Sequence, residues 1–295
     1  MEIQTTTCKL CPRACGIDRS RGEKGYCGMG DTILVSRCAP HLWEEPPISG
    51  TCGSGTVFFT GCSLRCVFCQ NAVISRELKG TPVRQDELCQ MILSLASTGV
   101  HNINLVTPSH YTEQLIPVLE KVRQQIDLPI VWNSSGYETV DSLRRLEGLV
   151  DVYLPDFKYI SSDLSSSYSA AADYAEVATN AVLEMYRQVG KPVFDHEGIM
   201  KKGMIIRHLV LPGCRKDALD VVRHLASILP SDGFKLSLMR QYTPEFALHT
   251  PYKNLHRRLT DFEYQSVVEE ALRLGLDGYT QGKDSATAAF TPDFD

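Results

Sequence analysis

The sequence predicts an α/β fold: an incomplete parallel (β/α)6 barrel preceded by a small Cys-rich segment. Short apolar runs alternate with longer amphipathic stretches along most of the chain, a pattern typical of parallel strands joined by helical crossovers. Six such runs precede the last predicted helix, one for each strand of an incomplete barrel. Six of the 11 cysteines lie before residue 55. This change in composition predicts a Cys-rich segment over residues 1–54 and a barrel over residues 55–295.

The predicted strands are short and mostly apolar, and the helices between them carry apolar residues on one face. We expect strands at residues 56–60, 102–106, 129–132, 150–154, 204–211 and 234–239, with a short seventh strand at 277–280. We expect helices at residues 85–97, 111–125, 140–146, 173–189, 216–229 and 261–274. In the first of these helices, Leu88, Ile92 and Leu95 share one face, which would pack against the sheet.

Three cysteines stand directly after the first predicted strand. Cys62, Cys66 and Cys69 have the spacing C-x3-C-x2-C, and Phe68 precedes the last of them. Thiolates are the usual ligands of iron–sulfur clusters, and three of them leave one iron of a 4Fe-4S cluster without a cysteine. Because a small molecule can bind at that iron and accept an electron from it, the spacing predicts a chemically active cluster.

Disulfides and structural zinc fit the three cysteines less well. Disulfides are typical of secreted proteins, whereas the first residues of this chain have no apolar stretch like that of a signal peptide. Structural zinc takes four closed ligands. No apolar run approaches the roughly 20 residues of a membrane span, and the formal net charge of −5 argues against a nucleic-acid partner. We therefore expect a cytoplasmic iron–sulfur protein that does not associate with membranes.

A second group of cysteines lies in the N-terminal segment. Cys8, Cys11, Cys15 and Cys27 form the pattern C-x2-C-x3-C-x11-C, in a segment too short to build an ordinary hydrophobic core. Bound metal commonly stabilises segments of this size. The spacing matches neither that of ferredoxins nor a pair of C-x2-C zinc knuckles. A second iron–sulfur cluster and a structural zinc both stay open as interpretations.

Polar side chains follow several of the predicted strands. Asn133 ends the third strand, and Asp156 and Lys158 follow the fourth. Arg207 and His208 lie in the fifth strand, where alternation turns one side chain inward and the other outward. Because active sites of β/α barrels lie at the carboxyl ends of the strands, these residues are candidates for binding a cofactor. A capped turn at Asn133 and a surface ion pair at the two charged residues are the alternatives.

The predicted strand at residues 56–60 and the cysteine loop that follows it resemble the radical S-adenosylmethionine (SAM) superfamily, in which a strand leads into such a loop. The run from Gly61 to Asn71 is similar to the loop of glycyl-radical-enzyme activases. Further segments resemble pyruvate formate-lyase activating enzyme-like proteins of the PflX type, and the likeness covers nearly the whole chain. These segments are residues 8–16, 45–50, 102–108, 151–159 and 207–213.

The resemblance implies a barrel of radical SAM type that binds SAM at the open iron. A reduced flavodoxin- or ferredoxin-like protein would donate the electron that cleaves SAM to methionine and a 5′-deoxyadenosyl radical. Members of the superfamily commonly hold the methionine end of SAM with a Gly-Gly-Glu-like segment after the second strand. This chain has residues 107–110 (TPSH) there instead. The cofactor-binding candidates are Phe68, Asn71, Thr107, Ser109, His110, Asn133, Asp156, Lys158, Arg207 and His208.

Two classes of function fit these observations. The first is a radical SAM oxidoreductase, similar to activating enzymes, that abstracts hydrogen from a substrate. Its substrate would be a glycyl radical enzyme that it activates or, alternatively, a small molecule, peptide or RNA that it modifies. The second class is an iron–sulfur electron carrier or zinc scaffold without catalysis. Cleavage of SAM by the reduced protein distinguishes the two classes.

Overall fold

The computed structural model describes residues 7–286 and 294, and it has the α/β fold that the sequence predicts. Seven strands of the described sheet are parallel to one another: β2 (Ser54–Phe59), β4 (Ile103–Val106), β5 (Ile130–Ser134), β6 (Val152–Pro155), β8 (Met200–Leu209), β9 (Lys235–Met239) and β10 (Gly278–Thr280). They follow one another in chain order across the sheet. The six predicted strands and the short seventh are therefore confirmed, with shifts of a few residues at their ends.

Three strands that the sequence analysis did not predict pair antiparallel to the others. β1 (Ile33–His41) lies beside β2 and β3 (Thr81–Val83) lies beside β1, so these two strands extend one edge of the sheet. β7 (Val193–Phe194) forms a hairpin with the start of β8. The described strands run from β10 to β3 without closing the sheet, as expected for an incomplete barrel. β1 crosses the predicted domain boundary by pairing with β2, and the boundary itself stays a prediction.

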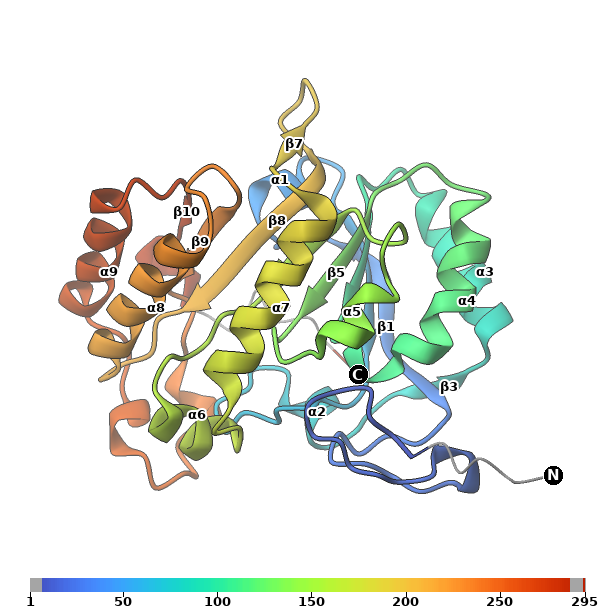
Figure 1. Ribbon diagram of the computed structural model, residues 1–295, viewed down its shortest axis with the longest axis horizontal. Helices are drawn as coiled ribbons and strands as arrows, with labels where there is room; N and C mark the ends of the chain where they lie inside the picture. The colour runs from blue at the N-terminus through green and yellow to red at the C-terminus, as the bar shows by residue number, and fades with distance from the viewer. Residues whose placement is uncertain (1–6, 287–293, 295) are drawn as a thin grey trace.

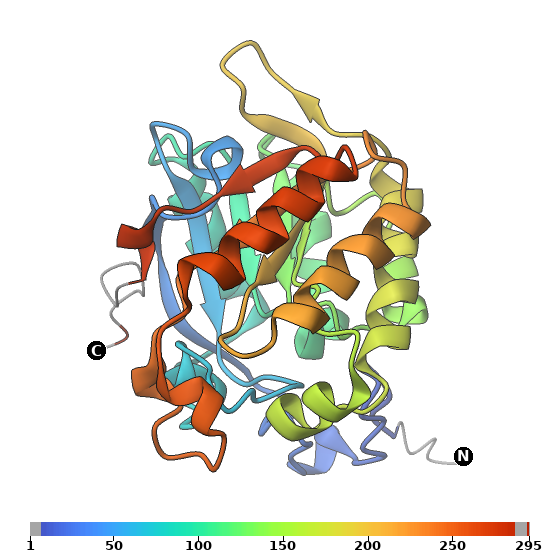
Figure 2. The ribbon, with the colours of Figure 1, turned by 90° about the vertical axis from the view of Figure 1, so that its left-hand side faces the viewer.

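The longer helices cover the outside of the curved sheet (Figures 1 and 2). Most of the longer helices occur where amphipathic stretches predict them. The longer helices are α3 (Gln85–Ala96), α4 (Thr112–Arg123), α6 (Ser162–Ser169), α7 (Tyr174–Val189), α8 (Arg215–Ile228) and α9 (Asp261–Arg273), and the short ones are α1 (Pro46–Ser49), α2 (Ala72–Ser75) and α5 (Val140–Arg144). α6 was not predicted and replaces part of a Ser-rich stretch. Within the described part of the chain, no helix has both the length and the apolar character needed to cross a membrane.

The two faces of the sheet are packed differently. On the helix side, a large core includes Trp132 and Tyr153, both fully buried. On the inner side, Ile48 of α1 packs with Val131 and Leu154 in a smaller apolar cluster. Because neighbouring residues of a strand point to opposite faces, Val131 and Trp132 reach these two cores from adjacent positions. The apolar cluster fills part of the barrel interior, whereas the carboxyl ends of the strands carry polar residues.

Candidate functional site

The three-cysteine loop is held in a tight conformation where β2 ends. Gly61 has a φ of 92°, and a side-chain carbon there would lie 2.5 Å from Met29 Cγ, so the position requires glycine. The Cys69 N–H donates to the Cys66 carbonyl over 3.2 Å, which closes the second half of the loop. α2 follows directly after this turn. The end of a central parallel strand thus fixes all three cysteines in space, as the sequence predicts.

Each of the three sulfur atoms accepts one hydrogen bond. The Leu64 N–H donates to Cys62 Sγ over 3.4 Å, the Ser169 hydroxyl to Cys66 Sγ over 2.9 Å, and the Ser75 hydroxyl to Cys69 Sγ over 3.3 Å. Burial, together with the neighbouring thiols, raises the pKa of Cys62 to about 12. The donors are oriented to stabilise negative charge on sulfur, but burial opposes that charge. A thiolate at Cys62 therefore needs a bound cation to balance it.

The donor chemistry of the loop fits an iron–sulfur cluster. Among residues 7–286 and 294, no three His, Cys, Asp or Glu side chains gather around one point as the ligands of a single metal ion do. A 4Fe-4S cluster places each thiolate on a different iron, so its ligands need not converge in that way. Cys66 and Cys69 face a cavity of about 460 Å³, which is large enough for a small cofactor.

A largely buried network of charges, whose side chains are 15–18% exposed, lines that cavity beside the cysteine loop. The Lys158 ammonium donates to Asp156 Oδ2 over 2.7 Å, and Arg207 Nε donates to Asp156 Oδ1 over 2.9 Å. Arg207 Nη2 also donates to Asn133 Oδ1 over 2.6 Å. Although burial favours the neutral carboxyl, the two cations hold the pKa of Asp156 below its ordinary value. β5, β6 and β8 supply these residues at their carboxyl ends, so the expected rim of polar groups is present.

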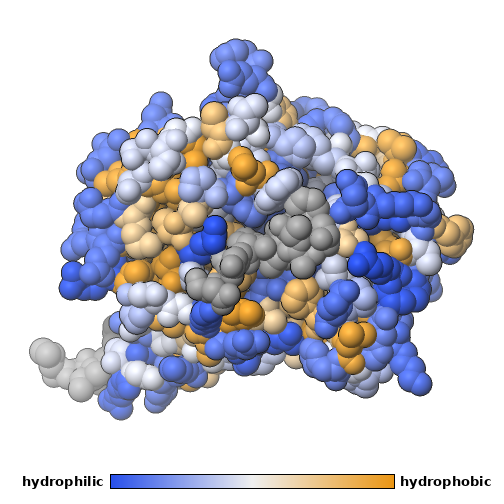
Figure 3. Space-filling model, turned by 180° about the vertical axis from the view of Figure 1, so that it is seen from behind, coloured by the Kyte–Doolittle hydropathy of each residue, from blue (hydrophilic) through white to orange (hydrophobic). Residues whose placement is uncertain are grey.

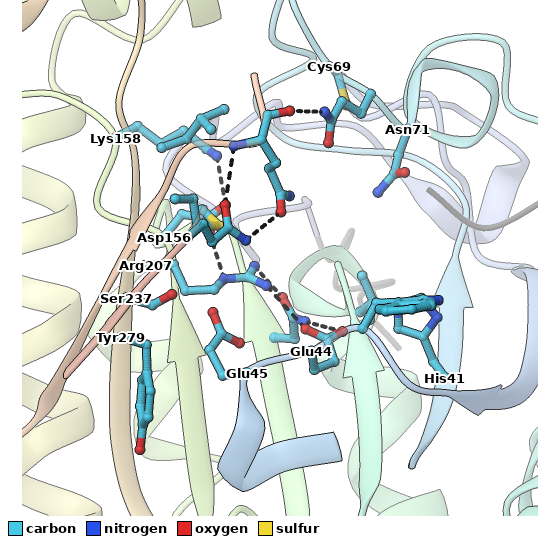
Figure 4. A pocket seen from close by; sticks show the side chains of 18 of the residues that line it. His41, Glu44, Glu45, Cys69, Asn71, Asp156, Lys158, Arg207, Ser237 and Tyr279 are labelled. Atoms are coloured by element: carbon cyan, nitrogen blue, oxygen red, sulfur yellow. Dashed lines mark hydrogen bonds and ion pairs between the residues drawn. The ribbon is translucent and has the colours of Figure 1, made fainter. Parts of the chain in front are cut away.

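Two carboxylates that the sequence analysis did not single out line the same cavity. Glu44 accepts from Asn104 Nδ2 over 3.0 Å and lies 3.5 Å from the Arg207 guanidinium. Glu45 is buried, and its Oε2 has no hydrogen-bond partner among the described residues. Burial raises the pKa of both carboxyls despite the attraction of Arg207. Figure 4 shows the two glutamates on one side of the Arg207 network, with Cys69 on the other.

The cofactor-binding candidates divide into those that line this cavity and those that lie behind it. The lining includes Phe68, Asn71, Asn133, Asp156, Lys158 and Arg207. The remaining four, Thr107, Ser109, His110 and His208, lie outside the lining formed by the described residues. Alternation in β8 thus turns Arg207 inward and His208 outward, as the strand pattern predicts.

Two of the four outlying candidates are histidines held by backbone carbonyl groups. His110 Nε2 lies 2.8 Å from the Thr60 carbonyl, and His208 Nδ1 lies 2.8 Å from that of Phe157. Burial lowers the pKa of each histidine to about 4, so both rings are neutral near pH 7. His110 therefore contacts the backbone at Thr60, directly before the cysteine loop. Any direct contact of these four residues with a cofactor stays a prediction.

Comparison with known proteins agrees with this arrangement. Residues 48–169 match a family model described as a 4Fe-4S single cluster domain, a span that includes Cys62, Cys66 and Cys69 and excludes Cys8 to Cys27. An uncharacterized protein of Methanocaldococcus jannaschii is 29% identical over 283 residues, which cover 92% of this chain and 75% of the relative.

Two solved structures share the fold. A radical SAM methyltransferase from Sphaerobacter thermophilus is similar with a TM-score of 0.52 and 15% identity, over 79% of this chain and 69% of that one. SuiB of Streptococcus suis, bound to the precursor peptide SuiA, is similar with a TM-score of 0.50 and 10% identity, over 75% of this chain and 46% of that one. At these identities the likeness shows the fold: the chain has the mostly parallel α/β architecture on which these two proteins are built.

Proposed function

We propose that this protein is a radical SAM enzyme. Cys62, Cys66 and Cys69 would bind a 4Fe-4S cluster, and SAM would occupy the cavity beside them. One observation supports this proposal above the others: the three-cysteine loop after β2 and the charge network at the ends of β6 and β8 face a common cavity. The match of residues 48–169 to a 4Fe-4S domain supports the cluster independently.

The residues of the cavity suit a zwitterionic nucleoside. When bound, the cluster would supply the electron that cleaves SAM to methionine and a 5′-deoxyadenosyl radical, which takes a hydrogen atom from the substrate. Lys158 offers an ammonium group to the SAM carboxylate, and Asp156 offers oxygen atoms to its amino group. Asn133 has amide groups at the adjoining strand end that suit ribose hydroxyls.

We further propose that the substrate is a protein, with a glycyl radical enzyme as the first choice and a reduced flavodoxin- or ferredoxin-like protein as electron donor. The resemblance of the cysteine loop to those of activases supports the first choice. Trp43 lines the cavity yet is 60% exposed, and neighbouring Leu42 is 57% exposed. Exposed apolar side chains at the mouth of a cavity suit contact with a polypeptide. Figure 3 shows apolar side chains scattered among hydrophilic ones on the face opposite to that seen in Figure 1.

Cleavage of SAM tests the enzymatic proposal. The protein is purified without oxygen, reconstituted with iron and sulfide and reduced with dithionite, and 5′-deoxyadenosine is measured by chromatography after SAM is added. We expect formation by the wild type and by Cys52→Ala, which changes an exposed cysteine outside both cysteine groups. Cys66→Ala should form none. A wild-type protein that holds a reduced cluster and leaves SAM intact would contradict the proposal.

Activation of a partner tests the choice of substrate separately. The reduced protein and SAM are mixed with a glycyl radical enzyme encoded by the same organism, and the organic radical is followed by electron paramagnetic resonance (EPR). A glycyl doublet that depends on both SAM and Cys66 is expected. Cleavage of SAM without any such radical on these enzymes would remove the activase role and leave the radical SAM proposal intact.

A further inference from the structure

The four N-terminal cysteines are brought together by a loop that folds back on itself. The Cys8 N–H donates to the Ile17 carbonyl over 2.9 Å, and the Gly16 N–H donates to the Cys8 carbonyl over 3.1 Å. The chain then returns, so that a side-chain carbon at Gly25 would lie 3.3 Å from Cys15 Sγ and 3.7 Å from Cys27 Sγ. Gly25 therefore lies directly against two of the sulfur atoms.

The same four thiols lie within electrostatic range of one another. Cys11 is buried, and its thiol lies close enough to those of Cys8, Cys15 and Cys27 to interact with them electrostatically. Cys27 is buried as well, whereas Cys8 and Cys15 are half-buried. Within residues 7–30, the only regular element is a three-residue 3-10 helix at Arg19–Arg21. Bound metal commonly stabilises segments that have so few backbone ladders and several cysteines close together.

This N-terminal site lies against the three-cysteine loop. The Cys62 N–H points at the Cys27 carbonyl over 3.4 Å, so residues of the two cysteine groups are in direct backbone contact. Figure 1 shows the N-terminal segment in dark blue at the same end of the molecule as the loop before α2. Close contact between two metal sites permits transfer of electrons from one to the other.

Arg13, within the Cys11–Cys15 stretch, ties the two sites together. Its Nε donates to the Ser63 carbonyl over 2.8 Å, and its Nη2 donates to the Ser169 carbonyl over 2.8 Å. The hydroxyl of the same Ser169 donates to Cys66 Sγ. The guanidinium also lies over the Tyr26 ring, 4.1 Å from its centre. One side chain therefore connects the N-terminal loop both to the cysteine loop and to a residue that contacts a cluster ligand.

We propose that Cys8, Cys11, Cys15 and Cys27 bind a second iron–sulfur cluster, in one-electron contact with the site at Cys62, Cys66 and Cys69. Four thiolates leave no iron open, so this cluster transfers electrons and binds no substrate. One electron enters it from a reduced flavodoxin- or ferredoxin-like donor, and the same electron leaves to the three-cysteine site, so the second cluster is unchanged over a cycle. The relay role rests on the proposed function, whereas the metal site does not.

One feature favours a cluster over zinc at this site, and a second would tune the reduction potential of that cluster. The site contacts a loop whose chemistry needs an electron, which a zinc ion cannot carry. Its sulfur atoms also accept hydrogen bonds from the protein: the Tyr26 N–H donates to Cys15 Sγ over 3.3 Å, and Arg19 Nη2 approaches Cys27 Sγ at 3.7 Å. Such hydrogen bonds raise the reduction potential of an iron–sulfur cluster, because they stabilise the more negative reduced form.

Metal analysis of a variant that lacks the first site tests the second one by itself. Cys62, Cys66 and Cys69 are all replaced by Ala, and the protein is reconstituted without oxygen in the presence of iron, sulfide and zinc. We expect about four irons and four sulfides per chain, as one 4Fe-4S cluster requires, with an EPR signal after reduction. Further replacement of Cys11 by Ser should remove them, whereas replacement of Cys52 by Ser should not. Zinc in place of iron, or a folded chain without metal, would overturn the proposal.

Spin coupling in the wild-type protein tests the electronic contact. When both clusters are reduced, their EPR signals should be broadened or split relative to those of the Cys62/Cys66/Cys69→Ala variant, which holds only the N-terminal cluster. Two full clusters whose signals simply add would refute the relay, whatever the outcome for SAM cleavage. Conversely, coupled clusters in a protein that does not cleave SAM would sustain this inference and remove the proposed function.

Discussion

The two cysteine groups of this protein are held in place in different ways. Cys62, Cys66 and Cys69 follow β2, whose residues are all buried and paired on both sides by β1 and β4. Cys8, Cys11, Cys15 and Cys27 lie in loops that are fixed by turns and by contacts of arginine side chains. A sheet therefore positions the three-cysteine loop directly, whereas the N-terminal cysteines depend on turns and on a few long side chains.

The largest effect is expected at the sheet-borne site, by which we mean Cys62, Cys66 and Cys69 together with the charged residues at the ends of β6 and β8. Arg207→Ala would remove the cation that pairs with Glu44 and Asp156, whose side chains are 9% and 16% exposed, and would leave Lys158 paired with Asp156 alone. Removal of one partner of a buried ion pair costs about 3–5 kcal/mol, because the other partner stays buried without compensation. We expect a decrease of that size in the free energy of unfolding, measured by urea denaturation, and loss of SAM cleavage.

A matched arginine lies on the surface. Arg145 pairs with Glu113, and both side chains are about half exposed. Arg145→Ala should cost about 0–1 kcal/mol because solvent already screens the pair. Equal losses for Arg207→Ala and Arg145→Ala would show that the cavity network is not a buried ion pair in solution.

Much of this sheet-borne site follows from local sequence. Asp156 and Lys158 come directly after an apolar run, and the carboxyl ends of parallel strands lie at a common edge, so their meeting with Arg207 could be predicted. Cys66 could likewise be placed by the strand before its loop. These inferences needed only the order of strands and the alternation of side chains along each of them.

Other parts of the site depend on tertiary contacts that local sequence does not encode. Glu44 and Glu45 precede Pro46 in a segment that resembles a surface turn, but both line the cavity and Glu45 is buried there. Ser169 stands in a Ser-rich stretch, and its contact with Cys66 spans 103 residues of chain. A Ser-rich stretch and a pair of glutamates are common on surfaces, so neither carries a signal that would single out these residues.

Replacement of Arg13 should destabilise the N-terminal loop, residues 7–30, while the barrel stays folded. Arg13→Gln removes the charged donor to the carbonyls of Ser63, Ser169 and Ala170. Hydrogen bonds from charged groups contribute about 1.5–3 kcal/mol when buried, so we expect a local loss of about 2 kcal/mol at this partly exposed position. Amide hydrogen exchange at residues 7–30 should become roughly 30-fold faster.

A neighbouring lysine serves as the control for this prediction. Lys9→Gln removes the same charge from an exposed position of the same loop and should leave amide exchange there unchanged. Exchange that accelerates equally throughout the sheet in Arg13→Gln would mean that the N-terminal loop and the barrel unfold as one unit.

A smaller effect, which depends on pH, is expected at Glu45. Its pKa is raised in the folded protein by burial, so the folded state binds the proton more tightly than the unfolded state does, and stability falls as pH rises above the unfolded value of about 4.3. Glu45→Gln mimics the protonated form. The variant should therefore melt at a higher temperature than the wild type at pH 7, and the difference should vanish near pH 4. A gain in melting temperature for Glu45→Gln that persists at pH 4 would exclude burial of charge as its cause.

The smallest expected effect compares two serines of α6. Ser169→Ala removes the hydroxyl that donates to Cys66 Sγ and should cost about 1 kcal/mol of unfolding free energy. Because hydrogen bonds to a ligand sulfur favour the reduced cluster, the variant should also have a lower reduction potential, measured by an EPR-monitored redox titration. Ser166→Ala changes an exposed serine of the same helix and should leave both quantities as they are. An unchanged potential in Ser169→Ala would mean that this hydroxyl is turned away from the sulfur when the cluster is bound, and that α6 contributes packing alone to the sheet-borne site.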